Sequence, residues 1–239
     1  MTGFYRPPDF SFSRISLGDR DCPIVISVQR PRIALIESFL DAQECAALIE
    51  WGVDRLEPAT VFDPELGRVE LSSQRTGWHA KVARAYSPVV RMVETRTSRL
   101  VGLPDSHGEL IDVIRYQIGQ AYRPHWDWFA PESSGGEQRI QRSGQRVTTV
   151  IMYLNDDLEG GATVFSRIGL TVRPRKGSAL FFCNVDDQGR VSRLTLHEGA
   201  PVLAGEKWIA TRWFCDRAQT QAGSDRQGPF QDGAGNAAM

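Results

Sequence analysis

The sequence contains no close pair of cysteines. Its four cysteines are far apart along the chain: Cys22, Cys45, Cys183 and Cys215. Zinc knuckles and dithiol redox motifs need two cysteines a few residues apart, so this spacing argues against both. We expect four buried free thiols, because an isolated cysteine behaves as a small hydrophobic residue.

An excess of charge of one sign and a long apolar run are also missing. The formal net charge is -1, so the composition provides no basic field for a nucleic acid. No stretch approaches the roughly 18 consecutive apolar residues of a membrane span, and no apolar run follows a basic N-terminus. We therefore expect a cytoplasmic protein with neither a nucleic-acid partner nor a membrane partner. The oligomeric state stays open.

The first half of the chain predicts short strands beside two helices. Hydrophobic residues make up 41% of the 239 positions, which is enough for a packed core. Residues 1–22 show no periodicity and are expected to form an irregular arm. A single domain is expected over residues 23–216, with helical support over 23–105. Apolar, β-branched runs predict strands at residues 24–28 and 33–36.

Both predicted helices have clear start signals. Asp41, with Glu44 three residues later, forms a capping-box pattern. Ser87 before Pro88 is typical of a second helix N-terminus. Apolar residues follow at helical spacing in both segments: Cys45, Leu48, Ile49, Gly52 and Val53 in the first, and Val89, Met92, Val93 and Leu100 in the second. Gly102 and Pro104 then predict the end of the second helix.

The second half of the chain, residues 106–216, reads as many short strands separated by turns. This pattern favours a sandwich, barrel or jelly roll. Residues 133–144 are polar and contain glycine, so we expect a mobile loop; residues 217–239 lack hydrophobic anchors, so we expect a disordered tail. The predicted strands are Leu110–Tyr116, Val147–Leu154, Ala162–Phe165, Leu170–Arg173, Ser178–Cys183, Arg193–Leu196 and Lys207–Phe214.

A possible metal site begins with His125 and Asp127, which are separated by one residue. In an extended segment such residues point to the same side. Two imidazoles and one carboxylate on one face suit Fe(II), and His197 is the histidine in the strand-rich half that can supply the second imidazole. Taken alone, this histidine–aspartate spacing is usually a coincidence, and His197 alone is equally compatible with an ordinary strand end.

The surrounding sequence resembles a known family over most of its length. The relevant segments are YQIGQAYRPHWDWF (116–129), RVTTVIMYLNDDLEGGATVF (146–165), PRKGSALFF (174–182) and LHEGAPVLAGEKWIATRWF (196–214). Their order, spacing and turn residues resemble prolyl 4-hydroxylase-type dioxygenases that depend on 2-oxoglutarate and Fe(II). The resemblance is strong from about Leu110 to Phe214, looser from Ile33, and absent from the tail.

The resemblance implies a fold and a set of binding residues. The fold would be mainly β with supporting helices (α+β), around a double-stranded β-helix core of the jelly-roll, cupin-like kind. His125, Asp127 and His197 would be the iron ligands. Lys207 would hold the distal carboxylate of 2-oxoglutarate, although a surface lysine beside Glu206 is the ordinary alternative.

The same resemblance indicates further positions in the site. Tyr116 and Thr163 would donate hydroxyl hydrogen bonds to 2-oxoglutarate, with ring packing and a turn residue as the respective alternatives. Trp213 and Arg146 would line the substrate site, with core packing and a solvated strand start as alternatives. Trp126 and Trp128 are larger than the aromatic residues common at these positions, and Trp128 is a candidate substrate contact.

The activity implied is hydroxylation coupled to the conversion of 2-oxoglutarate and O2 into succinate and CO2. The substrate would be a prolyl residue of a peptide or protein, and ascorbate would stimulate turnover. Three alternatives remain open. One is hydroxylation of a free amino acid or other small metabolite; the second is a non-catalytic jelly-roll binding protein; the third is a zinc hydrolase, which would give Lys207 no task.

Overall fold

The chain is described by a computed structural model over residues 5–63 and 68–219. Within these residues the strands form a nine-stranded sheet, a four-stranded sheet and two separate pairs. The large sheet has the order β1 (Arg14–Ser16), β2 (Asp21–Val28), β3 (Ile33–Ile36), β14 (Ala179–Cys183), β10 (Arg146–Tyr153), β17 (Lys207–Cys215), β8 (Ile111–Tyr116), β7 (Trp78–Val82) and β4 (Glu57–Pro58).

The small sheet provides the opposite wall of the core. Its order is β13 (Leu170–Val172), β12 (Thr163–Phe165), β15 (His197–Gly199) and β9 (Tyr122–His125). The separate pairs are β11 (Glu159–Gly160) with β16 (Val202–Ala204), and β5 (Thr60–Asp63) with β6 (Arg68–Leu71). The predicted mainly β fold with a jelly-roll core is confirmed.

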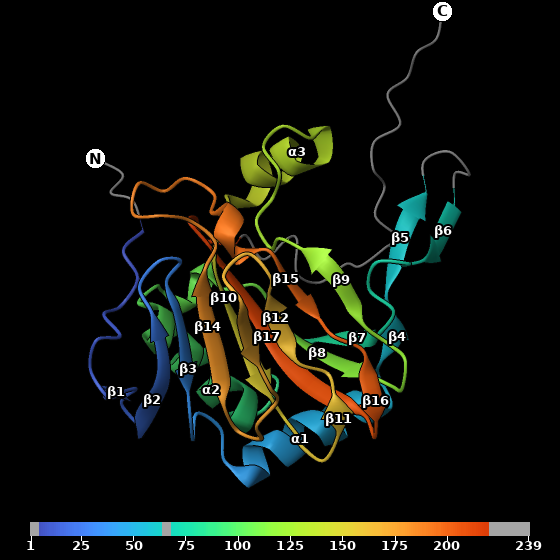
Figure 1. Cartoon of the computed structure of the whole chain (residues 1–239), viewed down its shortest axis with the longest axis horizontal. Helices are drawn as coiled ribbons and strands as arrows, with labels where there is room; N and C mark the ends of the chain where they lie inside the picture. Colours follow the sequence, from blue (N-terminus) through green and yellow to red (C-terminus); the bar gives the residue numbers. More distant parts are fainter. Residues whose placement is uncertain (1–4, 64–67, 220–239) are drawn as a thin grey trace, which may run out of the picture.

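Strand alternation gives the large sheet two apolar faces. On β10, Ile151 and Tyr153 pack in the core between the two sheets, whereas Val150 and Met152 pack in the core beneath the helices. Because both faces are covered, β10 has no solvated side, and its sequence is apolar at successive positions. Figure 1 shows α1 and α2 on one side of the large sheet and β9, β12 and β15 on the other.

Helix α1 (Ala42–Val53) begins as the sequence predicts. The Asp41 side chain accepts from the Glu44 backbone, and the Glu44 side chain accepts from the Asp41 backbone, which completes the capping box. Gly52 packs closely against the sheet, since a Cβ there would lie 3.0 Å from the Trp208 ring. Val53, the last residue of the helix, was expected on the buried face but is 53% exposed.

Helix α2 (Pro88–Val101) also matches its predicted limits. The Ser87 side chain accepts from the Val90 backbone, and Gly102 adopts the left-handed conformation, with φ 74°, that ends the helix. The predicted stripe is wrong at one position: Met92 is 39% exposed, and Val90 is buried instead. The buried face is therefore rotated slightly from the one expected.

Three segments differ from the sequence-based expectations. Residues 14–16 and 21–22 lie in β1 and β2 and are not irregular, and Leu17 between them is fully buried. Residues 134–143 form helix α3 (Ser134–Ser143), capped by Ser133, where a mobile loop was expected. The run EQRIQR consists of good helix formers, and the preceding glycines hide it in the sequence.

The third difference lies just before the second candidate histidine. Arg193–Thr195 forms a 3-10 turn (η2) where a strand was expected, and β15 starts only at His197. The four cysteines are buried free thiols, as predicted. Residues 220–239 of the expected tail lie outside the described residues, and the division into arm, domain and tail remains a prediction.

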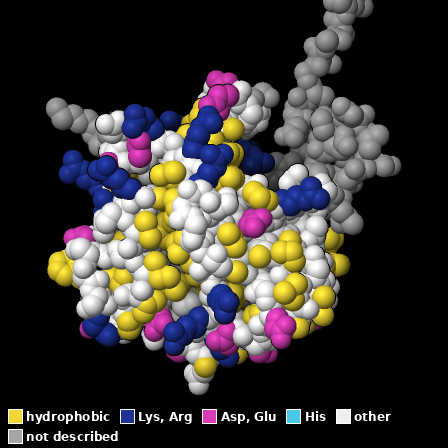
Figure 2. All heavy atoms as spheres, in the orientation of Figure 1, with side chains coloured by type: hydrophobic (Ala, Val, Ile, Leu, Met, Phe, Trp, Pro, Cys, Tyr) yellow, Lys and Arg dark blue, Asp and Glu magenta, His cyan; other side chains and the backbone are white. Residues whose placement is uncertain are grey.

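The surface and the helices add two observations. Figure 2 shows basic side chains gathered over the upper part of the visible face with a few acidic ones among them, and both kinds interspersed over the lower part. Among the described residues, no helix combines the length and the apolarity needed to cross a membrane.

Candidate active site

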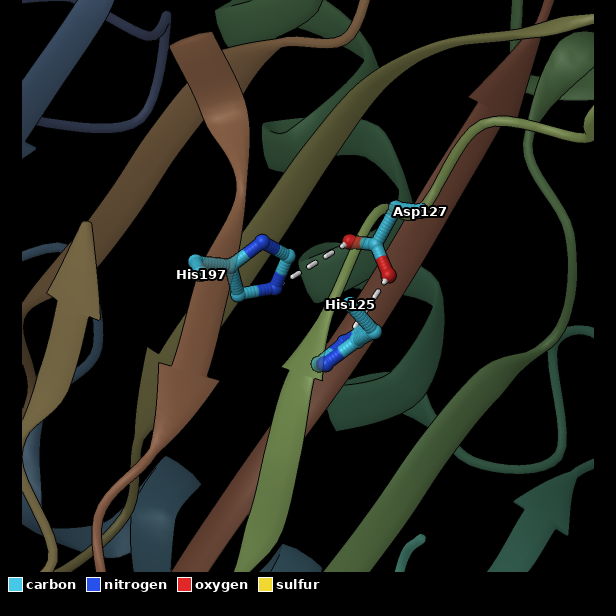
Figure 3. Close-up of side chains that lie close together, drawn as sticks. All are labelled: His125, Asp127 and His197. Atoms are coloured by element: carbon cyan, nitrogen blue, oxygen red, sulfur yellow. Dashed lines mark ion pairs between the residues drawn. The ribbon is translucent and has the colours of Figure 1, made fainter. Parts of the chain in front are cut away.

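Strand pairing brings the two candidate histidines together. His125 is the last residue of β9, His197 is the first residue of β15, and the two are direct partners in the antiparallel register. Asp127 follows two residues after His125, and its carboxylate lies 3.5 Å from His125 Nε2 and 3.8 Å from His197 Nε2. Figure 3 shows all three side chains pointing toward one another, and one ligand atom from each lies within 4.8 Å of the others.

The second nitrogen of each ring is already occupied. His125 Nδ1 lies 2.8 Å from the Arg123 carbonyl oxygen, and His197 Nδ1 lies 3.0 Å from the Thr195 carbonyl oxygen. A carbonyl oxygen only accepts, so each Nδ1 carries the proton and donates it. Each ring therefore presents Nε2 toward Asp127, and in the tautomer with the proton on Nδ1 this nitrogen carries the lone pair that a metal needs.

The charges in the site suit a divalent metal. Burial alone raises the pKa of Asp127, but the neighbouring His197 and His125 outweigh it and hold this pKa well below its usual range. Burial lowers the pKa of His197 to about 4. At neutral pH the carboxylate is therefore ionised and His197 is neutral, the forms that bind metal ions.

Aromatic rings fix the orientation of both histidines. The Tyr122 ring stacks on His125 with centroids 3.5 Å apart and an interplanar angle of 15°. Phe182 and Phe165 pack against His197, with ring centroids at 4.8 and 5.5 Å. The sequence reasoning assigned none of these three a role, since the aromatic spacing of a strand core does not reveal what it packs against.

Asp127 has a polar support that was also missed. Thr149 Oγ1 lies 2.8 Å from Asp127 Oδ2, and Asn184 Nδ2 lies 3.0 Å from Thr149 Oγ1. All three side chains are buried. No sequence signal marks either residue, because each reaches Asp127 only through the pairing of distant strands.

Lys207 is a buried cation without a counter-ion. Its side chain is 3% exposed, and within residues 5–63 and 68–219 its ammonium has neither a hydrogen bond nor an ion pair. Its Nζ lies 5.7 and 5.9 Å from the ring centroids of Tyr116 and Tyr153. Burial lowers its pKa to about 8. A buried ammonium without a counter-ion is costly in free energy, and an anionic ligand would offset that cost. Lys207 is therefore not a surface lysine, and its position suits the binding of a carboxylate.

The predicted hydroxyl donors lie in the same core. Tyr116 is buried and is the direct partner of Lys207 across β8 and β17. Thr163 is buried too, and its Oγ1 lies 2.8 Å from the hydroxyl of Tyr153, a residue that the sequence did not single out. The structure thus gathers Lys207, both predicted hydroxyls and Tyr153 between the two sheets.

Arg146 is not a solvated strand-start residue. Its guanidinium forms a two-point ion pair with Glu109, with Nη2 2.8 Å from Oε2. It also lies 4.2 Å from the centroid of the Trp213 ring and 4.8 Å from that of Phe129. Nη1 lies 3.5 Å from the Asp127 carbonyl oxygen. The side chain therefore links the Trp213 ring to the backbone of a candidate ligand.

The tryptophans around Asp127 join two loops. Trp126 Nε1 donates to the Arg193 carbonyl oxygen at 3.2 Å, and Trp128 Nε1 donates to the Ser192 carbonyl oxygen at 3.3 Å. Both rings are half-buried, with centroids 5.3 Å apart. They connect the segment that carries Asp127 to the segment that precedes His197.

A jelly roll that holds a His–Asp–His cluster, together with a buried lysine that has no ion pair in the described part of the chain, is the arrangement expected of an iron- and 2-oxoglutarate-dependent oxygenase. The profile of the 2OG-Fe(II) oxygenase superfamily matches residues 111–215. The chain is 36% identical over 204 residues to prolyl 4-hydroxylase 1 of Arabidopsis thaliana, covering 79% of this chain and 70% of that protein. It is 34% identical over 190 residues to the prolyl 4-hydroxylase subunit alpha-1 of Gallus gallus, covering 80% of this chain and 37% of that protein.

Solved structures agree on the fold. The viral collagen prolyl hydroxylase of Paramecium Bursaria Chlorella virus-1, in complex with 2-oxoglutarate, matches with a TM-score of 0.57 and 24% identity, over 76% of this chain and 94% of that one. A Pseudomonas putida prolyl-4-hydroxylase matches with a TM-score of 0.52 and 20% identity, over 78% and 93%. The chain belongs to the prolyl 4-hydroxylase-type 2-oxoglutarate- and Fe(II)-dependent oxygenases, which confirms the resemblance and the enzyme class.

Proposed function

We propose that this oxygenase hydroxylates prolyl residues in a peptide or protein. His125, Asp127 and His197 would hold Fe(II), and Lys207 would hold the distal carboxylate of 2-oxoglutarate. The observation that carries this assignment is the buried Lys207 ammonium, which has no anionic partner among the described residues. The rings nearest its charge, Tyr116 and Tyr153, belong to the same apolar cluster as Phe165 and Phe182, the rings that pack on His197. A zinc hydrolase or an inert jelly roll would have no use for such a cation.

When bound, Fe(II), 2-oxoglutarate and O2 would supply the oxidising chemistry, with succinate and CO2 as products. The chain would contribute metal ligands of fixed orientation, the positive charge of Lys207 and restricted access of water. The Nδ1–H groups of both histidines are tied to backbone carbonyls, which sets the direction of each Nε2. Phe165 and Phe182 cover His197, which is buried, and a site shielded from water on this side has stronger electrostatic interactions. Tyr116, whose ring centroid lies 5.7 Å from the Lys207 ammonium, and Thr163 would offer hydroxyls to the bound cosubstrate.

The substrate side of the site would lie near Trp213. The ring N–H of Trp213 is buried and lacks a partner among the described residues, which makes it available to a bound substrate. Arg146 is fully engaged by Glu109, so its contribution would be to hold the Trp213 ring. Trp128 is held by Ser192 and would border the site with its ring face.

A prolyl target is supported by the relatives, which are named prolyl 4-hydroxylases. The test is 2-oxoglutarate turnover with proline-rich peptides and with free amino acids, in the presence of Fe(II) and ascorbate. We expect ascorbate to stimulate turnover. Mass spectrometry should show a peptide gaining one oxygen on proline, and Asp127→Ala should show none. Hydroxylation of free amino acids alone would overturn the peptidyl-proline assignment and leave the oxygenase class intact.

A further inference from the structure

The carboxylate of Asp127 is held by two residues outside the predicted ligand set. We propose that Thr149 and Asn184 are positioning residues that hold Asp127 in its metal-binding orientation, with Asn184 acting through Thr149. This inference rests on the ligand assignment in the proposed function. Its basis is the continuous hydrogen-bonded chain from Asn184 Nδ2 to Thr149 Oγ1 (3.0 Å) and on to Asp127 Oδ2 (2.8 Å).

The direction of the two hydrogen bonds follows from their chemistry. An ionised carboxylate only accepts, so the single hydroxyl proton of Thr149 must be donated to Asp127. The Thr149 hydroxyl oxygen can then only accept a second hydrogen bond, and the Asn184 amide N–H donates it. Asn184 therefore keeps the Thr149 proton aimed at Asp127 by occupying the other side of the hydroxyl.

The support comes from the rigid large sheet. Thr149 lies in the middle of β10, paired with Phe182 of β14 on one side and Trp213 of β17 on the other. Asn184 directly follows β14, and its backbone N–H donates to the Val147 carbonyl oxygen at 2.8 Å. Both side chains are fully buried, so neither can reorient into water.

Asp127 needs such support because it lies beyond the end of β9. No strand pairing fixes its backbone, whereas His125 and His197 are register partners. With Oδ2 engaged by Thr149, Oδ1 is left facing His125 Nε2 at 3.5 Å and is the oxygen freer to bind a metal. Without Thr149, rotation of the carboxylate would no longer be restricted from the sheet side.

The first test uses Thr149→Val, which keeps the shape and removes the hydroxyl. Cobalt(II) serves as the probe, with affinity from titration and ligand geometry from its visible absorption. Loss of a group that orients a metal ligand typically costs about 10–100-fold in metal affinity, and we expect a loss in this range with an altered spectrum. Thr149→Ser keeps a hydroxyl and should restore both.

The matched control is Thr148→Val, the same change in the same strand. Thr148 is also fully buried but pairs with Cys183 and Phe214, in the core beneath the helices and away from Asp127. This variant should keep wild-type cobalt affinity and spectrum. An equal loss in Thr148→Val and Thr149→Val, or an unchanged Thr149→Val, would overturn the proposal.

The second test asks whether Asn184 acts through Thr149. Asn184→Leu should weaken cobalt binding in the wild-type background and add little once Thr149→Val is present, because the relay is already broken. Fully additive losses would contradict the relay. The cobalt assay needs no peptide substrate. Asp127→Ala distinguishes failure of the relay from failure of the ligand assignment, because unchanged cobalt binding in that variant would refute the ligand assignment itself.

Discussion

His125 and His197 are direct partners across the antiparallel pairing of β9 and β15, with ring centroids 4.3 Å apart. The two imidazoles are thus brought together by backbone hydrogen bonding between strands that are distant in the sequence. Asp127 is the one candidate ligand without such pairing, and it completes the cluster from the loop after β9. The geometry of the site therefore depends on the sheet for two ligands and on side-chain contacts for the third.

Replacing Asp127 with alanine should abolish both hydroxylation and tight metal binding. The change removes the only negative ligand of the cluster, and water would take the vacated position. Succinate formation and cobalt titration measure the two effects. Asp187→Ala is the control, since its carboxylate is 64% exposed and its ion pair is with Arg32, away from the cluster. Wild-type turnover in Asp127→Ala would refute the assignment.

Much of this arrangement can be predicted from the sequence where the signals are local. The caps at Asp41 and Ser87 depend on neighbouring residues, and both are present as expected. The spacing of His125 and Asp127 places them on one side of an extended segment. The proximity of His197 follows from the family resemblance, because no local pattern relates β15 to β9.

The features that the sequence did not predict depend on tertiary packing. Thr149 and Asn184 look like ordinary strand residues, and only the register of β10 and β14 reveals their chain to Asp127. Helix α3 was missed because its glycines outweighed the helix-forming residues that follow them. Met92 was placed on the buried face because the spacing of apolar residues does not fix the direction of that face closely enough to choose between Met92 and Val90.

Lys207→Ala should weaken 2-oxoglutarate far more than it weakens metal. Removing one partner of a buried charge pair costs about 2–5 kcal/mol, so we expect the KM for 2-oxoglutarate to rise by at least about 30-fold. Cobalt affinity in the absence of 2-oxoglutarate should change little. Lys176→Ala is the matched control, because this lysine is exposed. Equal losses of cosubstrate and metal would indicate a purely structural lysine.

The buried pair of Tyr153 and Thr163 should show coupled effects on stability. Their hydroxyls lie 2.8 Å apart, so Tyr153→Phe or Thr163→Val alone leaves one buried hydroxyl without its partner. Each single change should lower the free energy of unfolding by about 1–3 kcal/mol, and the double variant should lose less than the sum. Urea unfolding measures all three, and strictly additive values would mean that the hydrogen bond contributes nothing.

The affinity for 2-oxoglutarate should fall as the pH rises above about 8. Burial lowers the pKa of Lys207 to about 8 in the protein without ligand, and only the protonated ammonium attracts a carboxylate. Below this pKa the lysine is charged and binding is at its full strength. Above it, the lysine must first take up a proton, which costs about 1.4 kcal/mol for each pH unit and lowers the affinity close to tenfold.

Lys207→Arg separates this effect from other titrations, because a guanidinium stays protonated across the range. The dissociation constant of 2-oxoglutarate, measured between pH 7 and 9.5 with cobalt bound, should rise for the wild type and stay nearly constant for Lys207→Arg. Parallel curves for the two proteins would place the titrating group elsewhere in the site.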